Sequence, residues 1–286
     1  MEYSNIGEKI KLLTGSGMWH TREAEGLPSV HLSDGPHGLR KQEEKERQNN
    51  VSLVSTCYPT ASALACSWDV TAAERLGRAV AKEAWNADVA VLLGPGINMK
   101  RSPLCGRNFE YFSEDPFLAG RLGAAYVSAA QGENVAVSLK HFAANNQETN
   151  RQTSNSQIDE RALREIYLSA FEYVVKTARP ATVMASYNRL NGYYACENRH
   201  LLTEILREEW GFDGVVISDW GACADLAKAV KAGMDLEMPD SHGIHARKLK
   251  AALKAGEISE ADIAQAAGRI EKLVKKYAPD NRKKKD

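Results

Sequence analysis

The sequence lacks long apolar runs and net charge. Runs such as residues 89–96 and 215–217 are far shorter than the roughly 20 residues of a membrane-spanning helix, so we predict no membrane partner. The 37 lysines and arginines balance 37 acidic residues. Without a positive excess, the chain is not expected to bind nucleic acid or an acidic membrane surface.

The chain also lacks the cysteine and histidine spacings of common metal sites. Five cysteines, an odd number without Cys-x-x-Cys, favour reduced and mostly buried thiols over a disulfide framework or a zinc site. His242 and His245 lie three apart, which the edge of a soluble helix explains as well as a metal would. Gly94-x-Gly96 lacks the third glycine and the following helix of a phosphate cradle. We therefore predict no metal and no cofactor.

Residues 1–5 show no basic segment followed by an apolar stretch, so no secretory signal is predicted and a cytoplasmic location is the default expectation. A composition of 43% hydrophobic and 26% charged residues is typical of a globular protein. The 286 residues fit either two domains or a single α/β barrel, which usually takes about 250 residues.

Short apolar runs alternate with segments of helical period, which predicts a parallel sheet covered by helices. The firmest helix covers 159–177, and the pairs Thr71/Glu74 and Ser259/Asp262 have the spacing of helix-start capping boxes. The sheet is either a closed barrel or an open sheet, and in both the ligands gather at the carboxyl ends of the strands. The predicted strands are 29–33, 60–65, 89–93, 136–140, 182–186, 214–218 and 233–237, and further helices are predicted at 117–131, 200–210, 222–231, 244–255 and 261–277.

Polar residues follow several of these strands. Asp34 follows the first one, in a turn imposed by glycines and a proline, although it could be only a turn residue that bonds its own backbone. Residues 94–116 form a loop long enough to suggest a function. Lys140 and His141 end the strand at 136–140 and offer hydrogen-bond donors suited to hydroxyl groups. Because an unpaired buried lysine is costly, Lys140 is expected to belong to a site.

The most informative strand end is Asp219-Trp220. A carboxylate that leaves a buried strand beside an indole suits a sugar whose apolar face rests on an aromatic ring. Asp219 is therefore the candidate nucleophile, although it could instead cap a helix beginning near Ala222. Met184 and Tyr187 follow another strand, where Met184 could equally be a core residue.

Five motifs occur together: residues 33–40, 106–110, 140–142, 184–188 and 218–220. In this order they resemble glycoside hydrolase family 3, in particular the N-terminal barrel of its β-glucosidase-like members. The resemblance implies an α/β fold of the (β/α)8 or TIM-like type, irregular or incomplete, in a single domain over 1–278 with a charged linker-like tail at 279–286. It implies Asp219 as catalytic nucleophile, with a substrate-binding pocket made by Asp34, Arg40, Arg107, Lys140, His141, Met184, Tyr187 and Trp220.

The implied reaction is retaining hydrolysis of terminal, non-reducing β-D-glucosyl residues through a covalent glycosyl-Asp intermediate. It requires two carboxyl groups, and only Asp219 is evident. By the resemblance, the acid/base glutamate comes from a following C-terminal α/β sandwich domain, so the chain alone is expected to be weakly active or inactive and to self-associate through the surface that this domain would cover. The acids Glu148, Asp225, Glu237 and Asp240 are better explained as loop, helix-start or supporting residues.

Other interpretations remain open from the sequence. The single-domain β-N-acetylglucosaminidases of the family carry Pro-Gly-His-Gly where this chain has Ala143-Ala144-Asn145-Asn146, which makes that branch a poor match. The chain could also be a noncatalytic sugar-binding barrel. A third interpretation is a Schiff-base aldolase that uses Lys140 as its nucleophile.

Overall fold

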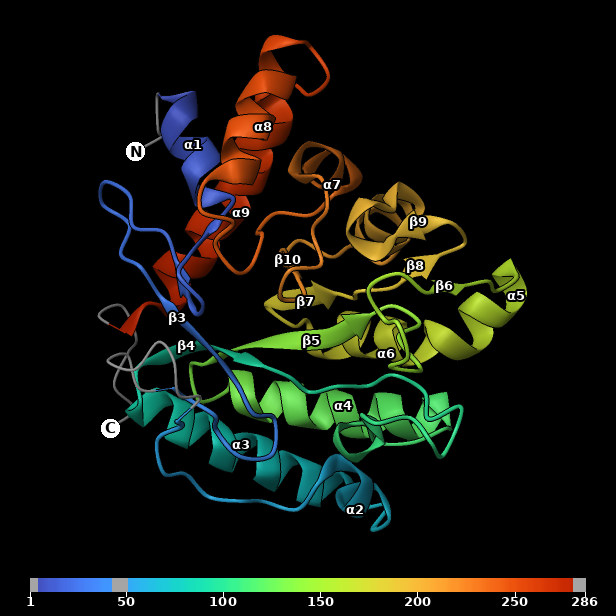
Figure 1. Ribbon diagram of the computed structural model, residues 1–286. Helices are drawn as coiled ribbons and strands as arrows, with labels where there is room; N and C mark the ends of the chain where they lie inside the picture. Colours follow the sequence, from blue (N-terminus) through green and yellow to red (C-terminus); the bar gives the residue numbers. More distant parts are fainter. Residues whose placement is uncertain (1–4, 43–50, 280–286) are drawn as a thin grey trace.

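The computed structural model describes residues 5–42 and 51–279, which form an α/β structure around one curled sheet (Figure 1). The strand order is β1-β2-β3-β4-β5-β7-β10, and only β2 runs against its neighbours. The strands are β1 Gly15–Ser16, β2 His20–Thr21, β3 His31–Asp34, β4 Val89–Leu93, β5 Ala136–Phe142, β7 Thr182–Ala185 and β10 Val215–Ser218.

Two isolated bridges continue this sheet beyond β10. Leu236 pairs in parallel with Ile217 of β10, and the next residue, Glu237, pairs with Thr14 just before β1. The Glu237 N–H donates to Leu13 O at 2.9 Å and the Gly15 N–H donates to Glu237 O at 2.9 Å. Through these bonds the last strand position meets the first one. The sheet is therefore an irregular barrel, which decides between the two architectures that the sequence left open.

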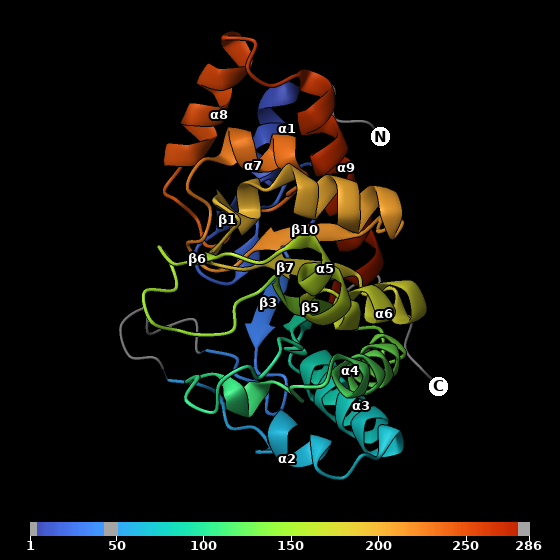
Figure 2. The same cartoon turned by 90° about the vertical axis from the view of Figure 1, so that its right-hand side faces the viewer.

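Helices lie around the outside of this barrel (Figures 1 and 2). Helices α3, α4 and α6 pack together on one side, while α1 contacts α9 and α7 contacts α8 on the other. A small second sheet of β6, β8 and β9 lies between α5 and η4 in the view of Figure 1. Their bounds are α1 Ile6–Leu12, α2 Ala61–Ala65, α3 Val70–Asn86, η1 Asn108–Glu110, α4 Pro116–Gln131, β6 Asn155–Ser156, α5 Glu160–Ala162, η2 Leu163–Tyr167, α6 Ser169–Ala178, β8 Arg189–Leu190, β9 Tyr193–Tyr194, η3 Ala195–Glu197, η4 His200–Glu209, α7 Leu226–Ala232, α8 Ile244–Lys254 and α9 Glu260–Tyr277.

Local capping explains where several helices begin. Ser259 and Asp262 form the predicted capping box at the start of α9, where each side chain accepts from the other residue's backbone N–H. Helix α3 begins slightly earlier than the predicted start at Thr71, because the Asp69 side chain accepts the Thr71 N–H at 2.8 Å. The tail predicted at 279–286 lies outside the described residues, apart from Pro279.

Two of the predicted strands are wrong. Residues 60–65 form helix α2 after Thr60, whose hydroxyl accepts the Ala63 N–H at 3.2 Å. The segment is rich in alanine, the strongest helix former, and contains no β-branched residue after Thr60. Of residues 233–237, only Leu236 and Glu237 pair with the sheet, because Gly233 adopts a positive φ of 115° as the cap that ends α7.

The helix predicted at 159–177 is interrupted. It consists of α5, the π-helical turn η2 and α6, so the apolar face continues although the backbone hydrogen-bond pattern changes. Segment η4 is also π-helical, over His200–Glu209. Helix α7 begins at Leu226 rather than at 222, because Asp225 caps it.

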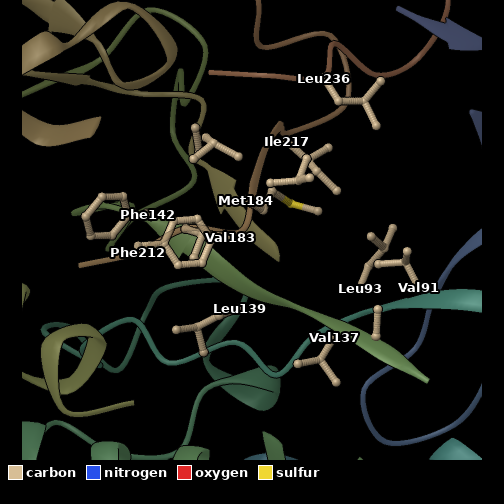
Figure 3. Close-up of a cluster of buried hydrophobic side chains, with 14 of the residues drawn as sticks. Val91, Leu93, Val137, Leu139, Phe142, Val183, Met184, Phe212, Ile217 and Leu236 are labelled. Atoms are coloured by element: carbon tan, nitrogen blue, oxygen red, sulfur yellow. The ribbon is translucent and has the colours of Figure 1, made fainter. Parts of the chain in front are cut away.

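The hydrophobic core lies within the barrel, where apolar side chains from neighbouring strands pack together (Figure 3). Met184 of β7 and Ile217 of β10 are register partners and lie side by side there, with Leu236 close to Ile217. Val137 and Leu139 of β5 are fully buried. This packing fixes the strand ends that carry the polar residues described next. Within the described segments, no helix has both the length and the hydropathy to cross a membrane.

Candidate active site

A cavity of about 380 Å³ opens at the carboxyl ends of the barrel strands. All nine residues that the sequence predicts as a site line it, so strand ends far apart in the chain do converge on one concavity. They are Asp34, Arg40, Arg107, Lys140, His141, Met184, Tyr187, Asp219 and Trp220, and the lining also includes Trp19, Leu93, Phe109, Glu110 and Arg151.

Asp219 follows β10 and is 7% exposed. One carboxylate oxygen, Oδ1, accepts the Trp220 N–H at 2.8 Å. The other, Oδ2, is buried and receives no hydrogen bond from any described residue, although His141 Nε2 lies at 3.7 Å and Arg107 Nη1 at 4.0 Å. Burial raises the pKa of Asp219, and the Arg107 charge and the Trp220 N–H offset this only in part. Helix α7 is capped by Asp225, so Asp219 is not the helix cap that the sequence also allowed.

Lys140 lies between two carboxylates. Its Nζ is 2.8 Å from Asp34 Oδ1 and 3.4 Å from Glu110 Oε2. Burial alone would lower the pKa of Lys140, but these two charges outweigh it and the pKa is raised. Burial would likewise raise the pKa of Asp34 and of Glu110, yet their cationic neighbours lower both. All three groups are therefore ionised at neutral pH.

The turn after β3 sets the position of Asp34. Gly35 has a positive φ of 111°, and a Cβ atom there would meet Gly38 O at 1.9 Å. Arg40 N–H donates to Asp34 O at 2.8 Å across this turn. Asp34 thus lies in a turn, but its carboxylate pairs with Lys140, so it is more than the turn residue that the sequence also allowed.

Arg107 determines the protonation of His141. An arginine only donates hydrogen bonds, so His141 Nε2, which lies 2.6 Å from Arg107 Nη2, must be the acceptor. The proton then resides on Nδ1, 3.0 Å from the Tyr111 hydroxyl. Burial lowers the pKa of His141 well below its ordinary value, and the Arg107 charge adds to this effect. Asp219 therefore faces a neutral imidazole and a cationic guanidinium.

Aromatic side chains form one wall of the cavity. The rings of Trp19 and Trp220 lie 5.1 Å apart at 37°. The Trp220 indole N–H donates to Met18 O at 2.7 Å, and the Tyr187 hydroxyl donates to Trp220 O at 2.9 Å. Trp220 is thus fixed at both its ring and its backbone. Met184, 2% exposed, both belongs to the core and lines the cavity.

Sequence reasoning missed four polar or aromatic residues of the site, which are Trp19, Phe109, Glu110 and Arg151. Glu110 accepts Arg107 Nε at 2.6 Å and faces Lys140, so it orients two predicted residues. The Arg151 guanidinium lies 4.3 Å from the centre of the Tyr187 ring. Trp19 precedes β2, far from any strand end that was identified. Phe109 and Glu110 stood within a recognised motif, and Arg151 directly follows the polar run 145–150, so these three had a signal, whereas Trp19 had none.

The four acids considered as substitutes for a second catalytic carboxyl group do not line the cavity in the described part of the chain. Glu148 bonds Arg151 at 2.9 Å and Asp240 bonds Arg22 at 2.8 Å. Asp225 caps α7, and Glu237 is buried against His245. Each has the supporting role expected of it.

The chain was compared with known families and proteins. The sequence model described as "Glycosyl hydrolase family 3 N terminal domain" matches residues 36–273. A thermostable β-glucosidase B from Acetivibrio thermocellus is 52% identical over 94% of this chain and 36% of the relative. An exo-α-(1→6)-L-arabinopyranosidase from Bifidobacterium longum is 50% identical over 83% of this chain and 32% of the relative.

Solved structures agree with the sequence match. The crystal structure of a β-glucosidase from Kluyveromyces marxianus in complex with glucose superposes with a TM-score of 0.91 at 40% identity, covering 98% of this chain and 33% of that one. The chain thus spans about a third of the length of the relatives it matches. The family match covers most of the sequence and includes every cavity-lining residue except Trp19 and Asp34. The chain therefore belongs to glycoside hydrolase family 3, with the irregular TIM-like barrel of its N-terminal domain.

Proposed function

We propose that this chain forms the nucleophile-bearing and sugar-binding part of a retaining β-glucosidase. The observation that carries the proposal is Asp219 Oδ2, a buried carboxylate oxygen that accepts no hydrogen bond from the described residues, lies 3.7 Å from His141 Nε2 and 4.0 Å from Arg107 Nη1, and faces a cavity otherwise rich in ion pairs. An oxygen with free lone pairs can attack a carbon atom, whereas one held by several donors is a weaker nucleophile. The carboxylates of Asp34 and Glu110 are held by Lys140 and Arg107 and are suited to binding.

In the proposed reaction, Asp219 Oδ2 forms a bond to the anomeric carbon while the bond from that carbon to the leaving oxygen breaks. The leaving oxygen takes a proton from a general acid, and water then releases the sugar from Asp219. The Arg107 charge favours the ionised form of Asp219 and offsets part of the rise in pKa that burial causes, while Asp34 and Lys140 are placed to bond sugar hydroxyls. The Trp220 ring offers an apolar surface to the sugar face.

We infer that the general acid is not supplied by the described residues that line the cavity. A general acid needs a raised pKa so that it holds its proton at neutral pH. The two lining carboxyl groups besides Asp219 both have lowered pKa values, because Lys140 and Arg107 lie beside them. We propose that a partner surface brings the acid, with a C-terminal α/β sandwich domain as its source.

Covalent trapping tests the role of Asp219. The chain is incubated with a 2,4-dinitrophenyl 2-deoxy-2-fluoro-β-glucoside, whose leaving group needs no general acid, and is then digested for mass spectrometry. The proposal predicts one fluoroglucosyl adduct, on the peptide that contains Asp219. The matched control is Asp34→Asn, which should slow labelling but leave its position unchanged. An adduct elsewhere, or none in a chain that binds glucose, would refute the proposal.

A second substrate class is favoured by the relative from Bifidobacterium longum, which is named an α-L-arabinopyranosidase. An α-L-arabinopyranoside has the ring configuration of a β-D-galactoside without the hydroxymethyl group, so its leaving group is equatorial as in a β-glucoside. The same attack by Asp219 would serve both. Comparing labelling rates for the two aryl glycosides decides between them, and a faster rate with the arabinopyranoside would assign the second class.

The two other interpretations have weaker support. A Schiff-base lysine must lose its proton, but Asp34 and Glu110 raise the pKa of Lys140. Borohydride with a keto acid should therefore leave Lys140 unmodified. A noncatalytic barrel would bind glucose equally well with Asp219→Asn and would form no adduct, so calorimetry and the trapping experiment together test that interpretation.

A further inference from the structure

A second group of chemically reactive side chains lies apart from the cavity. Cys223 comes from the loop between β10 and α7, Glu237 from the last strand position of the barrel, and His245 from the first turn of α8. One ligand atom from each lies within 4.8 Å of the others. Cys223 is 5% and Glu237 3% exposed, and none of the three lines the cavity that holds Asp219.

Backbone and side-chain contacts hold Glu237 and His245 in place. Glu237 is fixed by backbone hydrogen bonds to Leu13 and Gly15, the residues on either side of Thr14. The His245 N–H lies 3.3 Å from Ser241 Oγ, and His245 Nδ1 makes a short contact with Glu237 Oε1. Ser241 Oγ also lies 3.3 Å from Glu237 Oε2. A thiol, a carboxylate, an imidazole and a hydroxyl group therefore surround one small volume.

Cys223 and Glu237 are both buried, and their ligand atoms lie close together. A divalent ion at this position would supply a positive charge and bind the thiolate and carboxylate forms. The thiol proton, and any proton shared by Glu237 and His245, would pass to solvent on binding. His245 is half-buried, which leaves a route by which an ion can enter.

We propose that Cys223, Glu237 and His245 form a binding site for a zinc-type divalent cation. One sulfur, one imidazole nitrogen and one carboxylate oxygen are the donors that zinc prefers, whereas calcium and magnesium prefer oxygen alone. Ligand atoms around zinc lie about 2.0–2.3 Å from the ion, hence about 3.3–3.8 Å from each other in a tetrahedron. From the observed spacing, movements of the ligand atoms by about 1 Å would suffice to reach this geometry. Water or the Ser241 hydroxyl group would take the fourth position around the ion.

The site would be structural rather than catalytic. Cys223 lies four residues after Asp219, in a loop whose Gly221 N–H donates to Met238 O at 2.8 Å. A metal bound here would cross-link the loop that carries Asp219 and Trp220 to the segment 237–245. This inference is independent of the proposed glycosidase function. It differs from the sequence expectation of no metal, because that expectation used local histidine spacing and these ligands are distant in the chain.

Cobalt titration tests the site directly. The full chain, carrying Cys57→Ser and Cys66→Ser to remove the two exposed thiols, is stripped with a chelator and titrated with Co²⁺ alone. We expect a sulfur-to-cobalt charge-transfer band that saturates at one equivalent and is displaced by Zn²⁺. Both Cys223→Ser and His245→Gln should remove this saturable band, whereas His242→Gln, an exposed histidine three residues away, should retain it.

Zinc should also raise the Tm of the parent chain and protect Cys223 from alkylation, as read by peptide mass spectrometry. The alkylation readout uses the unsubstituted Cys223, so the test stands even if Cys223→Ser does not fold. Absence of the charge-transfer band at one equivalent, or equal alkylation of Cys223 with and without zinc, would overturn the proposal.

Discussion

Two sets of carboxylates line one cavity and differ in what surrounds them. Asp34 and Glu110 lie 2.8 and 3.4 Å from Lys140 Nζ, and their pKa values are lowered. Asp219 accepts one N–H, its nearest guanidinium nitrogen is 4.0 Å away, and its pKa is raised. The first arrangement stabilises fixed anions that can bind hydroxyl groups. The second leaves a reactive oxygen free, so the same residue type serves two roles according to its neighbours.

Removal of the Asp219 carboxylate should have the largest effect. Asp219→Asn keeps the shape but loses the nucleophile, so the rate of labelling by the dinitrophenyl fluoroglucoside should fall by about 10⁴-fold or more. Asp34 and Glu110, which lie beside Lys140, form the paired set. Glu110→Gln should lower the rate much less, because Glu110 binds and orients other groups and does not attack the sugar. Stopped-flow detection of dinitrophenolate measures both rates. Equal losses in the two variants would remove the distinction between the two sets.

Removal of Lys140 should remove the ion pairs that hold Asp34 and Glu110. Lys140→Met leaves the carboxylates of Asp34 and Glu110 without their shared cation, which typically costs about 3–5 kcal/mol in the free energy of unfolding. Denaturant unfolding at pH 7 measures the loss. The control is Lys228→Met, because Lys228 lies on the surface 3.9 Å from Asp225 and its removal should change little. A loss in Lys140→Met no larger than in the control would contradict the pairing.

The aromatic wall should contribute to sugar binding without affecting either set of charges. Trp19→Ala removes the ring beside Trp220, and we expect an affinity for glucose that is weaker by about two- to tenfold, because an aromatic contact contributes about 0.5–1.5 kcal/mol. Titration calorimetry measures the affinity. Trp68→Ala is the matched control, since Trp68 is 73% exposed and does not line the cavity. An unchanged affinity in Trp19→Ala would place the sugar elsewhere.

The pH dependence of stability should also differ between Asp219 and the paired set. This effect should be smaller than the three effects described above. Because the folded pKa of Asp219 is raised, its contribution to stability is fully present below the unfolded pKa of about 4 and is lost as the pH rises through the folded value. Asp219→Asn should therefore have a higher Tm than the parent chain at pH 7, and the difference should vanish near pH 3.

The paired set has the opposite sign. The folded pKa values of Asp34 and Glu110 are lowered, so their stabilisation is present above the unfolded pKa and is lost as the pH falls through the folded values. Lys140→Met should therefore flatten the acid side of the stability profile. Calorimetric scans from pH 3 to pH 7 measure both trends, and a profile in which Asp219→Asn destabilises the chain at pH 7 would contradict the account.

Much of the site could be predicted from the sequence. Parallel strands bring their carboxyl ends together, and this does not depend on the conformation of the loops. That rule places Asp34, Lys140 and Asp219 in one cavity without knowledge of the loops. It cannot place Trp19, whose position depends on how the N-terminal segment crosses the barrel mouth. Nor could it find the Cys223–Glu237–His245 cluster, which arises where the last strand position meets the first helix turn that follows.

The fold was less fully predicted at its edges. The first two strand positions contain only two residues each, too short for any periodic pattern, and the closing position pairs through Leu236 and Glu237 alone. Alanine-rich residues 60–65 are predicted as a strand because an apolar run of that length fits a strand and a short helix equally. Tertiary hydrogen bonds decide the structure at the first and closing strand positions, whereas helix propensity and the Thr60 cap decide it at 60–65.

Chemical rescue tests the central distinction most directly. In Asp219→Ala, azide can occupy the vacated space and attack carbon one of 2,4-dinitrophenyl β-glucoside from the α face, displacing dinitrophenolate. The account predicts that NMR will detect α-glucosyl azide with Asp219→Ala and none with Asp34→Ala. Production of β-glucosyl azide, or rescue of Asp34→Ala in place of Asp219→Ala, would contradict it.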